Sequence, residues 1–228
     1  MHQTMQVIIA GTGKLANELL HSMKVDSSAK LVSWENKSNE EAKSIVVHAG
    51  SGRELEAIAS YCASTQSTLI ELATGSKAES MPIAFPIVLC PNTNILMLKF
   101  MAMLEQCGKM FSGYDINITE SHQASKTSVP GTAVNIAQSL EKSIGDIQSV
   151  RDASIQRSQL EIPEPDLERH AFHQVIIHEG KCSVKLETRV YGEAPYAEGV
   201  SQIVAAASNH KLEGRLYSVM EFVKNGWL

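Results

Sequence analysis

The chain has 228 residues, of which 43% are hydrophobic and 20% are charged, a balance that excludes a disordered or fibrous protein and allows one ordinary domain with a smaller partner. Its formal net charge of -5 offers no overall attraction for nucleic acid or for an anionic membrane surface. Because no apolar run approaches the roughly 18 residues of a membrane-spanning helix, we expect a soluble, cytoplasmic protein with neither a nucleic-acid nor a membrane partner.

Short apolar segments alternate with helical patterns in the first part of the chain. A strand is expected at Gln6–Ala10, and apolar residues recur at helical spacing over Leu15–Met23. Further strands are expected at Lys30–Trp34, Ser44–His48, Thr68–Ala73 and Ile87–Cys90, with a helix at Glu54–Ala63. This alternation predicts an α/β, Rossmann-like domain with a doubly wound parallel sheet.

The pattern changes after Asn92. Helices are expected at Ile95–Lys109, Gly131–Ile144, Ala197–Ala207 and Leu216–Leu228, and strands at Asp115–Ser121, Gln174–His178 and Ser183–Tyr191. The last two strands read as a hairpin whose turn contains Glu179 and Gly180. We therefore predict a second, α+β domain with a mixed or antiparallel sheet.

The sequence shows no pattern typical of a metal site or a disulfide framework. The four cysteines are widely spaced and form no CxxC pair, as expected of reduced thiols in the cytosol. No acids or cysteines that converge with His170, His173 or His178 can be identified. We expect no bound metal, and core or surface roles for these histidines.

A glycine-rich turn directly follows the first expected strand and opens the first expected helix. Its sequence, Gly11-Thr12-Gly13-Lys14-Leu15-Ala16, is a G-x-G-x-x-A motif. Gly11 permits the tight turn, Gly13 lets the backbone approach a pyrophosphate, and Ala16 allows close packing of helix and strand. The helix N-terminus adds N–H donors and the positive end of its dipole. This context predicts a dinucleotide site, whereas the motif alone is also compatible with a plain strand-to-helix turn.

Glu35 follows the second expected strand, where an acid can pair with the hydroxyls of the adenine ribose. Its carboxylate favours NADH because it repels the 2′-phosphate of NADPH. Lys37 can pair with that phosphate, so the expected cofactor is NADH or NADPH. An ordinary solvated acid and a solvated lysine are the alternative interpretations of these side chains.

The segment ESHQASKTSVPGTA, Glu120 to Ala133, brings acid–base groups close to an expected anion site. His122 and Lys126 precede a Pro-Gly-Thr turn that opens a helix, and a helix N-terminus attracts anions. From these residues alone, a catalytic role competes with a hydrogen-bonded histidine and a solvated lysine.

This segment resembles the active-site segment of the dihydrodipicolinate reductases of bacterial and plant lysine biosynthesis. In that family a strand ending in Glu is followed by a His-rich stretch, a Lys and a Pro-Ser-Gly-Thr-Ala type turn. Thr74-Gly75-Ser76, Cys90-Pro91-Asn92 and the PYAEGV segment from Pro195 to Val200 are also similar to elements of the family. The resemblance runs in order over nearly the whole chain.

The resemblance implies a role for each matching residue. His122 and Lys126 match a catalytic histidine and a proton-donating lysine, while Gly131 and Thr132 match groups that hold a substrate carboxylate. Gln123 stands where many members have a second histidine, and it can hydrogen-bond the substrate. The remaining cofactor contacts fall on Ala73, Thr74, Gly75, Cys90, Asn92 and Thr93, for which simple strand-terminating turns are the alternative.

The resemblance implies the reduction of a small-molecule dicarboxylate, as 4-hydroxy-tetrahydrodipicolinate reductases do in the diaminopimelate route to lysine. It further implies a dinucleotide-binding domain at residues 1–92, completed by helices within 197–228, and a substrate-binding and oligomerisation domain at 93–196. The implied assembly is a homotetramer formed through the sheet of the second domain. An aspartate or amino-acid dehydrogenase and a non-catalytic NAD-binding sensor are the alternative functions.

Overall fold

A computed structural model describes residues 4–38, 42–192 and 196–228. The chain divides into two compact units, Met1–Leu98 with Pro195–Leu228, and Lys99–Ala194. The first unit therefore draws on both ends of the chain, and the second is a single stretch between them. Within the described ranges, no helix is long and apolar enough to cross a bilayer.

The first unit is built on a six-stranded sheet in the order β10-β5-β4-β3-β1-β2. Its strands are β1 (Met5–Ala10), β2 (Ala29–Ser33), β3 (Ile45–His48), β4 (Thr68–Glu71), β5 (Ile87–Leu89) and β10 (Leu216–Ser218). Every neighbouring pair is parallel. Every side chain of β3 and β4 is buried, which explains why their residues are mainly apolar and do not alternate with exposed polar ones.

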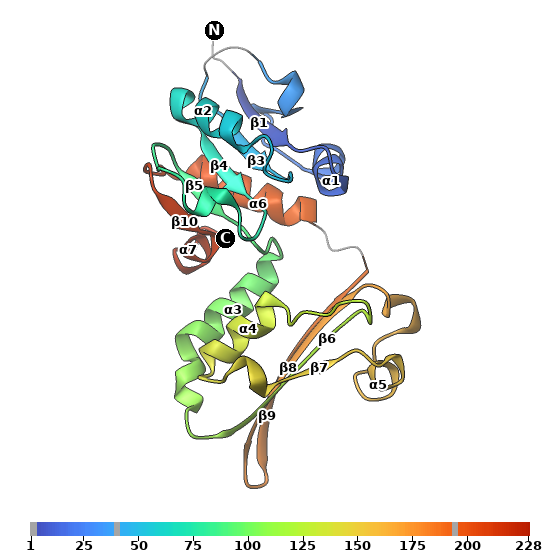
Figure 1. Ribbon diagram of the computed structural model, residues 1–228. Helices are drawn as coiled ribbons and strands as arrows, with labels where there is room; N and C mark the ends of the chain where they lie inside the picture. The colour runs from blue at the N-terminus through green and yellow to red at the C-terminus, as the bar shows by residue number, and fades with distance from the viewer. Residues whose placement is uncertain (1–3, 39–41, 193–195) are drawn as a thin grey trace. The chain divides into compact units, whose positions relative to one another are not determined.

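Helices cover both faces of this sheet, as Figure 1 shows. The helices α1 (Lys14–Ser22), α6 (Tyr196–Asn209) and α7 (Val219–Lys224) bury Leu19, Val200 and Phe222 in one core. On the other face, α2 (Leu55–Thr65) buries Ile58. Each fully buried aliphatic or aromatic side chain contributes about 1.5–3 kcal/mol to this packing. The predicted Rossmann-like, doubly wound domain is confirmed.

The C-terminal segment differs from the predicted continuous helix over Leu216–Leu228. Leu216–Ser218 is the edge strand β10, which pairs in parallel with β5, and helix α7 covers only Val219–Lys224. Tyr217 is buried in the core. Ser218 accepts a hydrogen bond from the Met220 N–H and caps the helix. The first residues of this segment form a strand and the following ones a helix, so the single helical period of the prediction does not describe both.

The second unit contains a four-stranded mixed sheet in the order β7-β6-β8-β9. Its strands are β6 (Asp115–His122), β7 (Ile147–Val150), β8 (His170–Glu179) and β9 (Cys182–Tyr191). β6 pairs in parallel with β7, whereas β6 with β8 and β8 with β9 are antiparallel. Gly180, with a φ of 57°, permits the tight hairpin turn between β8 and β9. The predicted α+β domain with a mixed sheet is confirmed, but β7 was not predicted.

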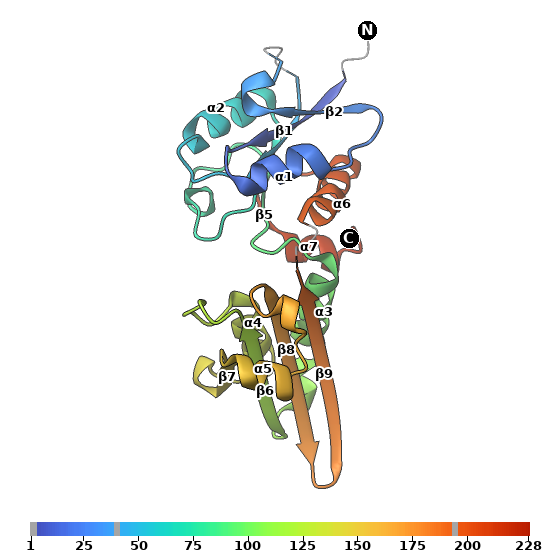
Figure 2. The ribbon, with the colours of Figure 1, turned by 90° about the vertical axis from the view of Figure 1, so that its right-hand side faces the viewer.

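Both faces of the second sheet are covered. On one face, α3 (Ile95–Cys107) and α4 (Gly131–Ser139) enclose a core that includes Ile118, Ile136 and Val175. A smaller core on the opposite face contains Phe172 and lies near α5 (Ala153–Ser158). In Figure 1, α5 lies on the opposite side of the strands from α3 and α4, and in Figure 2 it lies in front of the strands. Helix α4 ends at Ser139 and not at the predicted Ile144, because the backbone turns left-handed at Glu141, with a φ of 58°.

Candidate active site

The glycine turn after β1 has the geometry that a phosphate-binding turn requires. Gly11 has a φ of 134°, and a Cβ at this position would lie 2.6 Å from the carbonyl oxygen of Ala49. A Cβ on Gly13 would meet no atom of the chain within 4 Å, so the backbone is open on that side. Gly13 is the N-cap of α1, and because glycine has no side chain, it leaves the N–H groups of the first turn without a side-chain cap. The turn can therefore accept a pyrophosphate against the helix N-terminus.

The other predicted cofactor residues follow the carboxyl ends of strands in the same parallel sheet. Glu35 lies in a 3-10 turn, Trp34–Asn36, directly after β2. Ala73–Gly75 follows β4, and Cys90–Thr93 follows β5. β1 lies between β2 and β3, where the order of the strands reverses, and a doubly wound sheet binds its ligands at the carboxyl edge beside such a point. The structure therefore brings the predicted cofactor segments to one edge of the first unit.

Glu35 and Lys37 are placed differently from each other. The Glu35 side chain is exposed. The Lys37 ammonium lies 4.2 Å from the centroid of the Trp34 ring and donates a hydrogen bond to the Trp34 carbonyl at 3.4 Å. This cation–π contact gives Lys37 a partner within its own turn. Its pairing with a 2′-phosphate stays a prediction.

The turn after β4 is held by the buried carboxylate of Glu71. The Ala73 N–H donates to Oε1 at 2.8 Å, and Ser76 Oγ donates to Oε2 at 2.9 Å. Gly75 has a φ of 67°, a backbone conformation that favours glycine. Thr74 and Gly75 are exposed at the edge of the sheet. The N–H groups of Ala73 and Gly75 are thus both used within the turn, that of Gly75 by Oε1 of Glu79 at 2.8 Å, while Thr74 is exposed to another molecule.

The segment after β5 is partly buried and makes a side-chain contact within itself. Cys90 is 1% exposed, and burial raises the pKa of its thiol, with a further contribution from the nearby Glu71 carboxylate. Asn92 accepts a hydrogen bond from the Asn94 N–H at 2.9 Å, and Thr93 is buried. The Cys90 thiol is therefore a neutral core side chain, so a contact between Cys90 and a cofactor would have to use the backbone.

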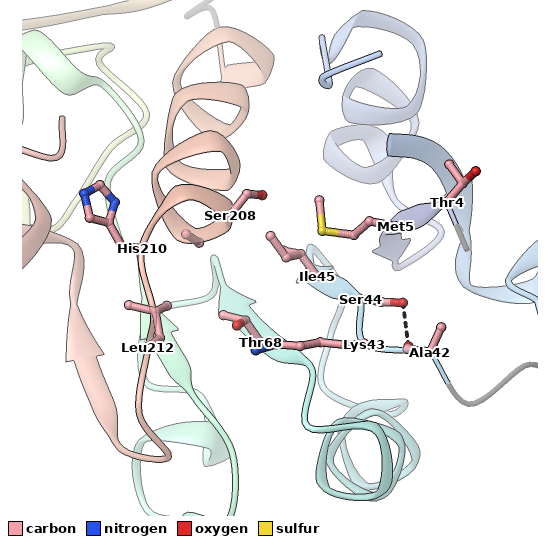
Figure 3. A pocket seen from close by; sticks show the side chains of 11 residues that line it. Thr4, Met5, Ala42, Lys43, Ser44, Ile45, Thr68, Ser208, His210 and Leu212 are labelled. Atoms are coloured by element: carbon pink, nitrogen blue, oxygen red, sulfur yellow. Dashed lines mark hydrogen bonds between the residues drawn. The ribbon is translucent and has the colours of Figure 1, made fainter. Parts of the chain in front are cut away.

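A pocket of about 400 Å³ lies at the opposite edge of this sheet (Figure 3). Met5, Ile45 and Thr68, which line it, are the first residues of β1, β3 and β4. Ser208, from the last turn of α6, and His210, just beyond that helix, complete one side. None of the predicted cofactor residues lines this pocket, so it is distinct from the candidate dinucleotide site.

In the second unit, a buried carboxylate holds the predicted catalytic histidine. His122 is the last residue of β6, and its Nδ1 lies 2.8 Å from Oε2 of Glu120. Arg151 Nη2 donates to Oε1 of the same carboxylate at 2.6 Å. Burial by itself would raise the pKa of Glu120, but hydrogen bonds from His122, Arg151 and Ser149 outweigh it and lower the pKa to about 2. Glu120 is therefore ionised near neutral pH.

The ionised carboxylate fixes the proton on His122. Because a carboxylate without a proton can only accept hydrogen bonds, Nδ1 of His122 must be the donor in this contact. The other ring nitrogen, Nε2, is then the one that can exchange a proton with a bound molecule. The His122 side chain is 14% exposed, whereas that of Glu120 is fully buried.

A second histidine lies beside this pair. His173 stands opposite Glu120 in the β6–β8 register, and its ring centroid is 5.7 Å from that of His122. Burial lowers the pKa of His173 to about 4, and the neighbouring His122 lowers it as well. Nδ1 of His173 lies 3.2 Å from Thr188 Oγ1, while Nε2 has no hydrogen-bond partner among the described residues. His173 is thus a neutral ring packed against the catalytic candidate.

Lys126 and the helix N-terminus lie in the segment that follows β6. The Lys126 N–H donates to the Gln123 carbonyl at 3.0 Å, and its own carbonyl accepts a bond from Arg151 Nε at 2.9 Å. Helix α4 begins at Gly131, where an added Cβ would meet no atom of the chain within 4 Å. Thr132 is half-buried in its first turn. The arrangement combines acid–base side chains with an anion-binding helix end in one unit.

Sequence reasoning did not identify Arg151 and His173 as site residues. Arg151 directly follows β7, and only the parallel pairing of β7 with β6 brings it to Glu120. His173 precedes the predicted start of its strand at Gln174. Alternation from the buried residues Val175 and Ile177 would have placed His173 on the same inner face, and this was the available signal.

Side chains of the types that bind metals do not cluster in the part of the chain that the structure describes. Over residues 4–38, 42–192 and 196–228, no group of three or more His, Cys, Asp or Glu side chains could hold a metal ion. Glu120 has both carboxylate oxygens engaged by His122 and Arg151. Its charge is therefore used to orient side chains of the chain itself.

Known sequences place these features in a family. A family model described as dihydrodipicolinate reductase, C-terminus, matches residues 97–223, more than half of the chain. The chain is 30% identical to 4-hydroxy-tetrahydrodipicolinate reductase 2, chloroplastic, of Arabidopsis thaliana, over 61% of this chain and 44% of that protein. It is also 30% identical to probable 4-hydroxy-tetrahydrodipicolinate reductase 1, chloroplastic, of Oryza sativa subsp. japonica, over 61% and 45%. The matches thus span less than half the length of these curated relatives.

Solved structures agree with the fold. The dipicolinate-bound dihydrodipicolinate reductase from Paenisporosarcina sp. TG-14 is similar with a TM-score of 0.65 and 15% sequence identity, over 96% of this chain and 99% of that one. At this identity the likeness supports the architecture alone. The family model, in contrast, includes the segment that carries His122, Lys126 and Gly131. The chain belongs to the dihydrodipicolinate reductase family, whose members are oxidoreductases.

Proposed function

We propose that the chain acts as a 4-hydroxy-tetrahydrodipicolinate reductase, which uses NADH or NADPH to reduce a small cyclic dicarboxylate in the diaminopimelate route to lysine. The observation that carries this proposal is the Glu120–His122 pair, in the unit that also contains Lys126 and the Gly131–Thr132 helix end. Reduction of an imine dicarboxylate needs a proton donor next to a carboxylate-binding group, and this unit offers both. Membership of the family supports the same reaction.

The first unit fits a nicotinamide dinucleotide. Gly11-Thr12-Gly13-Lys14-Leu15 would hold the pyrophosphate, and Glu35 would accept hydrogen bonds from the adenine ribose. Ala73–Gly75 and Cys90–Thr93 would flank the nicotinamide, which supplies a hydride when bound. Residues 1–92, completed by 197–228, are accordingly proposed as the dinucleotide-binding domain, and 93–196 as the substrate-binding and oligomerisation domain.

Residues of the second unit would bind the substrate and stabilise the negative charge that develops on it. Thr132 Oγ1 and the first N–H groups of α4 bind a carboxylate, and Gln123 contributes a further hydrogen bond. Negative charge develops over the ring nitrogen and its conjugated carbon as the substrate is reduced. Nζ of Lys126 stabilises this charge and donates the proton, while Nε2 of His122 polarises the ring or relays a proton.

Lys126→Ala tests this proposal. Loss of a general acid should lower kcat by roughly two to four orders of magnitude and leave the dissociation constant of NADH nearly unchanged. The assay supplies pyruvate, aspartate semialdehyde and the preceding synthase, and follows the absorbance of NADH. Lys181→Ala, in the exposed β8–β9 turn, is the matched control and should retain wild-type turnover.

The outcomes separate the proposal from its alternatives. Near-normal turnover of Lys126→Ala would remove this lysine from the mechanism. A wild-type protein that binds NADH but turns over neither this substrate nor an amino acid would be a sensor. Oxidation of aspartate or another amino acid would instead indicate a dehydrogenase of similar architecture.

The proposal includes a homotetramer in the cytoplasm. β9 is a ten-residue edge strand of the second sheet, and such an edge offers unpaired backbone groups to a second chain. The free thiols of Cys107 and Cys182 are exposed, which supports a reducing compartment. Light scattering should give about four times the chain mass of 24.8 kDa, and a monomer mass would refute this assembly.

A further inference from the structure

We propose that Arg151 and Glu120 are positioning residues, which hold the His122 ring and the Lys126 turn in one fixed arrangement and thereby set the turnover rate. This inference rests on the proposed function, because it assigns a task to the residues that support the proposed acid–base groups. Neither side chain needs to contact the substrate for this task.

Arg151 connects two segments through one rigid group. Its Nη2 donates to Oε1 of Glu120 at 2.6 Å, and its Nε donates to the Lys126 carbonyl at 2.9 Å. Nη1 binds the Val150 carbonyl at 2.8 Å, which fixes the guanidinium to the end of β7. Because the guanidinium is planar, its donors have fixed relative directions. A displacement of the Lys126 turn would therefore break or strain the contact with Glu120.

Glu120 transmits this constraint to the histidine. Its two carboxylate oxygens are divided between Arg151 and His122, and the side chain is fully buried. The carboxylate keeps the proton of His122 on Nδ1 and directs Nε2 away from itself. One chain of contacts thus runs from the Lys126 carbonyl through Arg151 and Glu120 to the ring of His122.

The backbone of His122 is held independently of this chain. Gln156 Nε2, on α5, donates to the His122 carbonyl at 2.8 Å and to Ser121 Oγ at 3.0 Å. Removing the Glu120 carboxylate should therefore release the His122 ring without moving the end of β6. This separation makes the role of the carboxylate measurable.

Stability alone is a weak reason for such a pair. A buried ion pair is often no more stabilising than apolar side chains of the same volume, because both charges lose their hydration. A positioning role instead predicts a loss of turnover that exceeds any loss of stability. The two interpretations differ in kcat, in the pH profile and in the protonation of the His122 nitrogens.

Conservative variants separate these roles. Glu120→Gln keeps the size of the side chain but replaces an accepting oxygen by an NH2 group, and Arg151→Lys keeps the charge but loses the planar donors. We expect each to lower kcat by about tenfold to a hundredfold, with a smaller change in KM and an unchanged NADH dissociation constant. Glu164→Gln and Arg157→Lys alter the exposed Arg157–Glu164 pair, 2.7 Å apart, and should leave kcat unchanged.

A second readout does not depend on turnover. Nitrogen-15 spectra of the histidine rings, with the His122 signals identified from His122→Asn, report which ring nitrogen carries the proton. The wild type should show a hydrogen-bonded proton on Nδ1 of His122, and Glu120→Gln should lose it or move it to Nε2. The acid limb of the pH profile of kcat/KM should shift in the same variant.

These measurements distinguish the two possible failures. A wild-type protein that does not reduce the substrate but shows the Nδ1 proton refutes the proposed function and leaves the support of His122 by Glu120 intact. Unchanged spectra and an unchanged kcat in Glu120→Gln overturn the positioning role. If Glu120→Gln proves unstable, Arg151→Lys decides, because a wild-type kcat in that folded variant also overturns it.

Discussion

Each unit contains a buried glutamate paired with a histidine, and the two pairs differ in exposure. In the first unit, His48 Nδ1 lies 2.8 Å from Oε2 of Glu71, and both side chains are 0% exposed. In the second unit, the same distance separates His122 and Glu120, but the His122 ring reaches the surface. The pairing is therefore shared, and access from solvent is what distinguishes the two histidines.

The partners of the two carboxylates show the same contrast. Glu71 also accepts hydrogen bonds from Ala73 and Ser76, so its pair fixes the turn after β4. His48 Nε2 is buried and has no hydrogen-bond partner among the described residues. Glu120 instead shares its charge with Arg151, which also binds the Lys126 carbonyl. A glutamate–histidine pair thus indicates an acid–base function only where a ring nitrogen is accessible to a ligand.

Among the variants that test this contrast, the largest expected effect on turnover comes from breaking the Glu120–His122 pair. His122→Asn removes the exchangeable ring nitrogen, and kcat should fall roughly a hundredfold to a thousandfold, the scale of acid–base assistance. The melting temperature should fall less than in a variant that leaves a buried carboxylate without any donor, because asparagine keeps an N–H donor and Arg151 still pairs with Glu120. Steady-state kinetics and thermal unfolding on the same sample check both statements. Wild-type turnover would assign His122 the same structural role as His48.

A comparably large effect, on stability instead of turnover, is expected from breaking the fully buried Glu71–His48 pair. His48→Leu leaves the Glu71 charge buried without its imidazole partner, and the free energy of unfolding should fall by roughly 3–5 kcal/mol. Turnover of the remaining folded protein at saturating cofactor should stay near that of the wild type. Urea unfolding combined with a kinetic assay tests this. A stable variant with a large loss of kcat would reverse the proposed contrast between the pairs.

How well the sequence predicts a feature depends on whether neighbouring or distant residues determine it. The glycine turn lies between a strand and a helix that are adjacent in sequence, and the left-handed backbone of Gly11 explains its residue type. The strands β3 and β4 are buried on both faces, so their apolar runs indicate a parallel sheet. Both features could be predicted because neighbouring residues determine them.

Features that depend on distant residues could not be predicted in the same way. β7 is short, and only Val150 is buried in its sequence, Ile-Gln-Ser-Val, so its apolar pattern is weak. Without β7, Arg151 has no assigned neighbour, and its contact with Glu120 is invisible in the sequence. The role of β10 as a sheet edge likewise depends on β5, which lies far away in the chain.

A smaller effect is expected for His173, the neutral ring that packs against His122. Unfolded His173 titrates near its ordinary pKa of 6.5, whereas burial lowers its pKa to about 4 in the folded chain. Between these values the unfolded chain binds more protons, so stability falls as the pH drops from 6.5 towards 4. Between pH 7 and pH 5, the free energy of unfolding should therefore fall by roughly 2 kcal/mol less in His173→Gln than in the wild type. Urea unfolding at the two pH values measures this, and parallel losses would show that His173 does not titrate in this way.

The smallest effect concerns Glu35, a carboxylate which, unlike Glu71 and Glu120, is exposed. Its proposed partners are the ribose hydroxyls of NADH, and its charge repels the 2′-phosphate of NADPH. Glu35→Ala should therefore weaken the binding of NADH and strengthen the binding of NADPH relative to it. If each effect is near 1 kcal/mol, the ratio of the two dissociation constants shifts by about tenfold or more.

Lys37→Ala is the companion variant. The Lys37 ammonium is held over the Trp34 ring, so it must leave that contact to reach a phosphate, and its effect on the ratio should be opposite in sign and smaller than that of Glu35. Both dissociation constants must be measured at one ionic strength, because charges at an exposed site are screened by salt. A ratio that Glu35→Ala leaves unchanged would mean that this carboxylate does not face the ribose. The choice of cofactor would then have to come from the glycine turn, where Lys14 is the charged side chain.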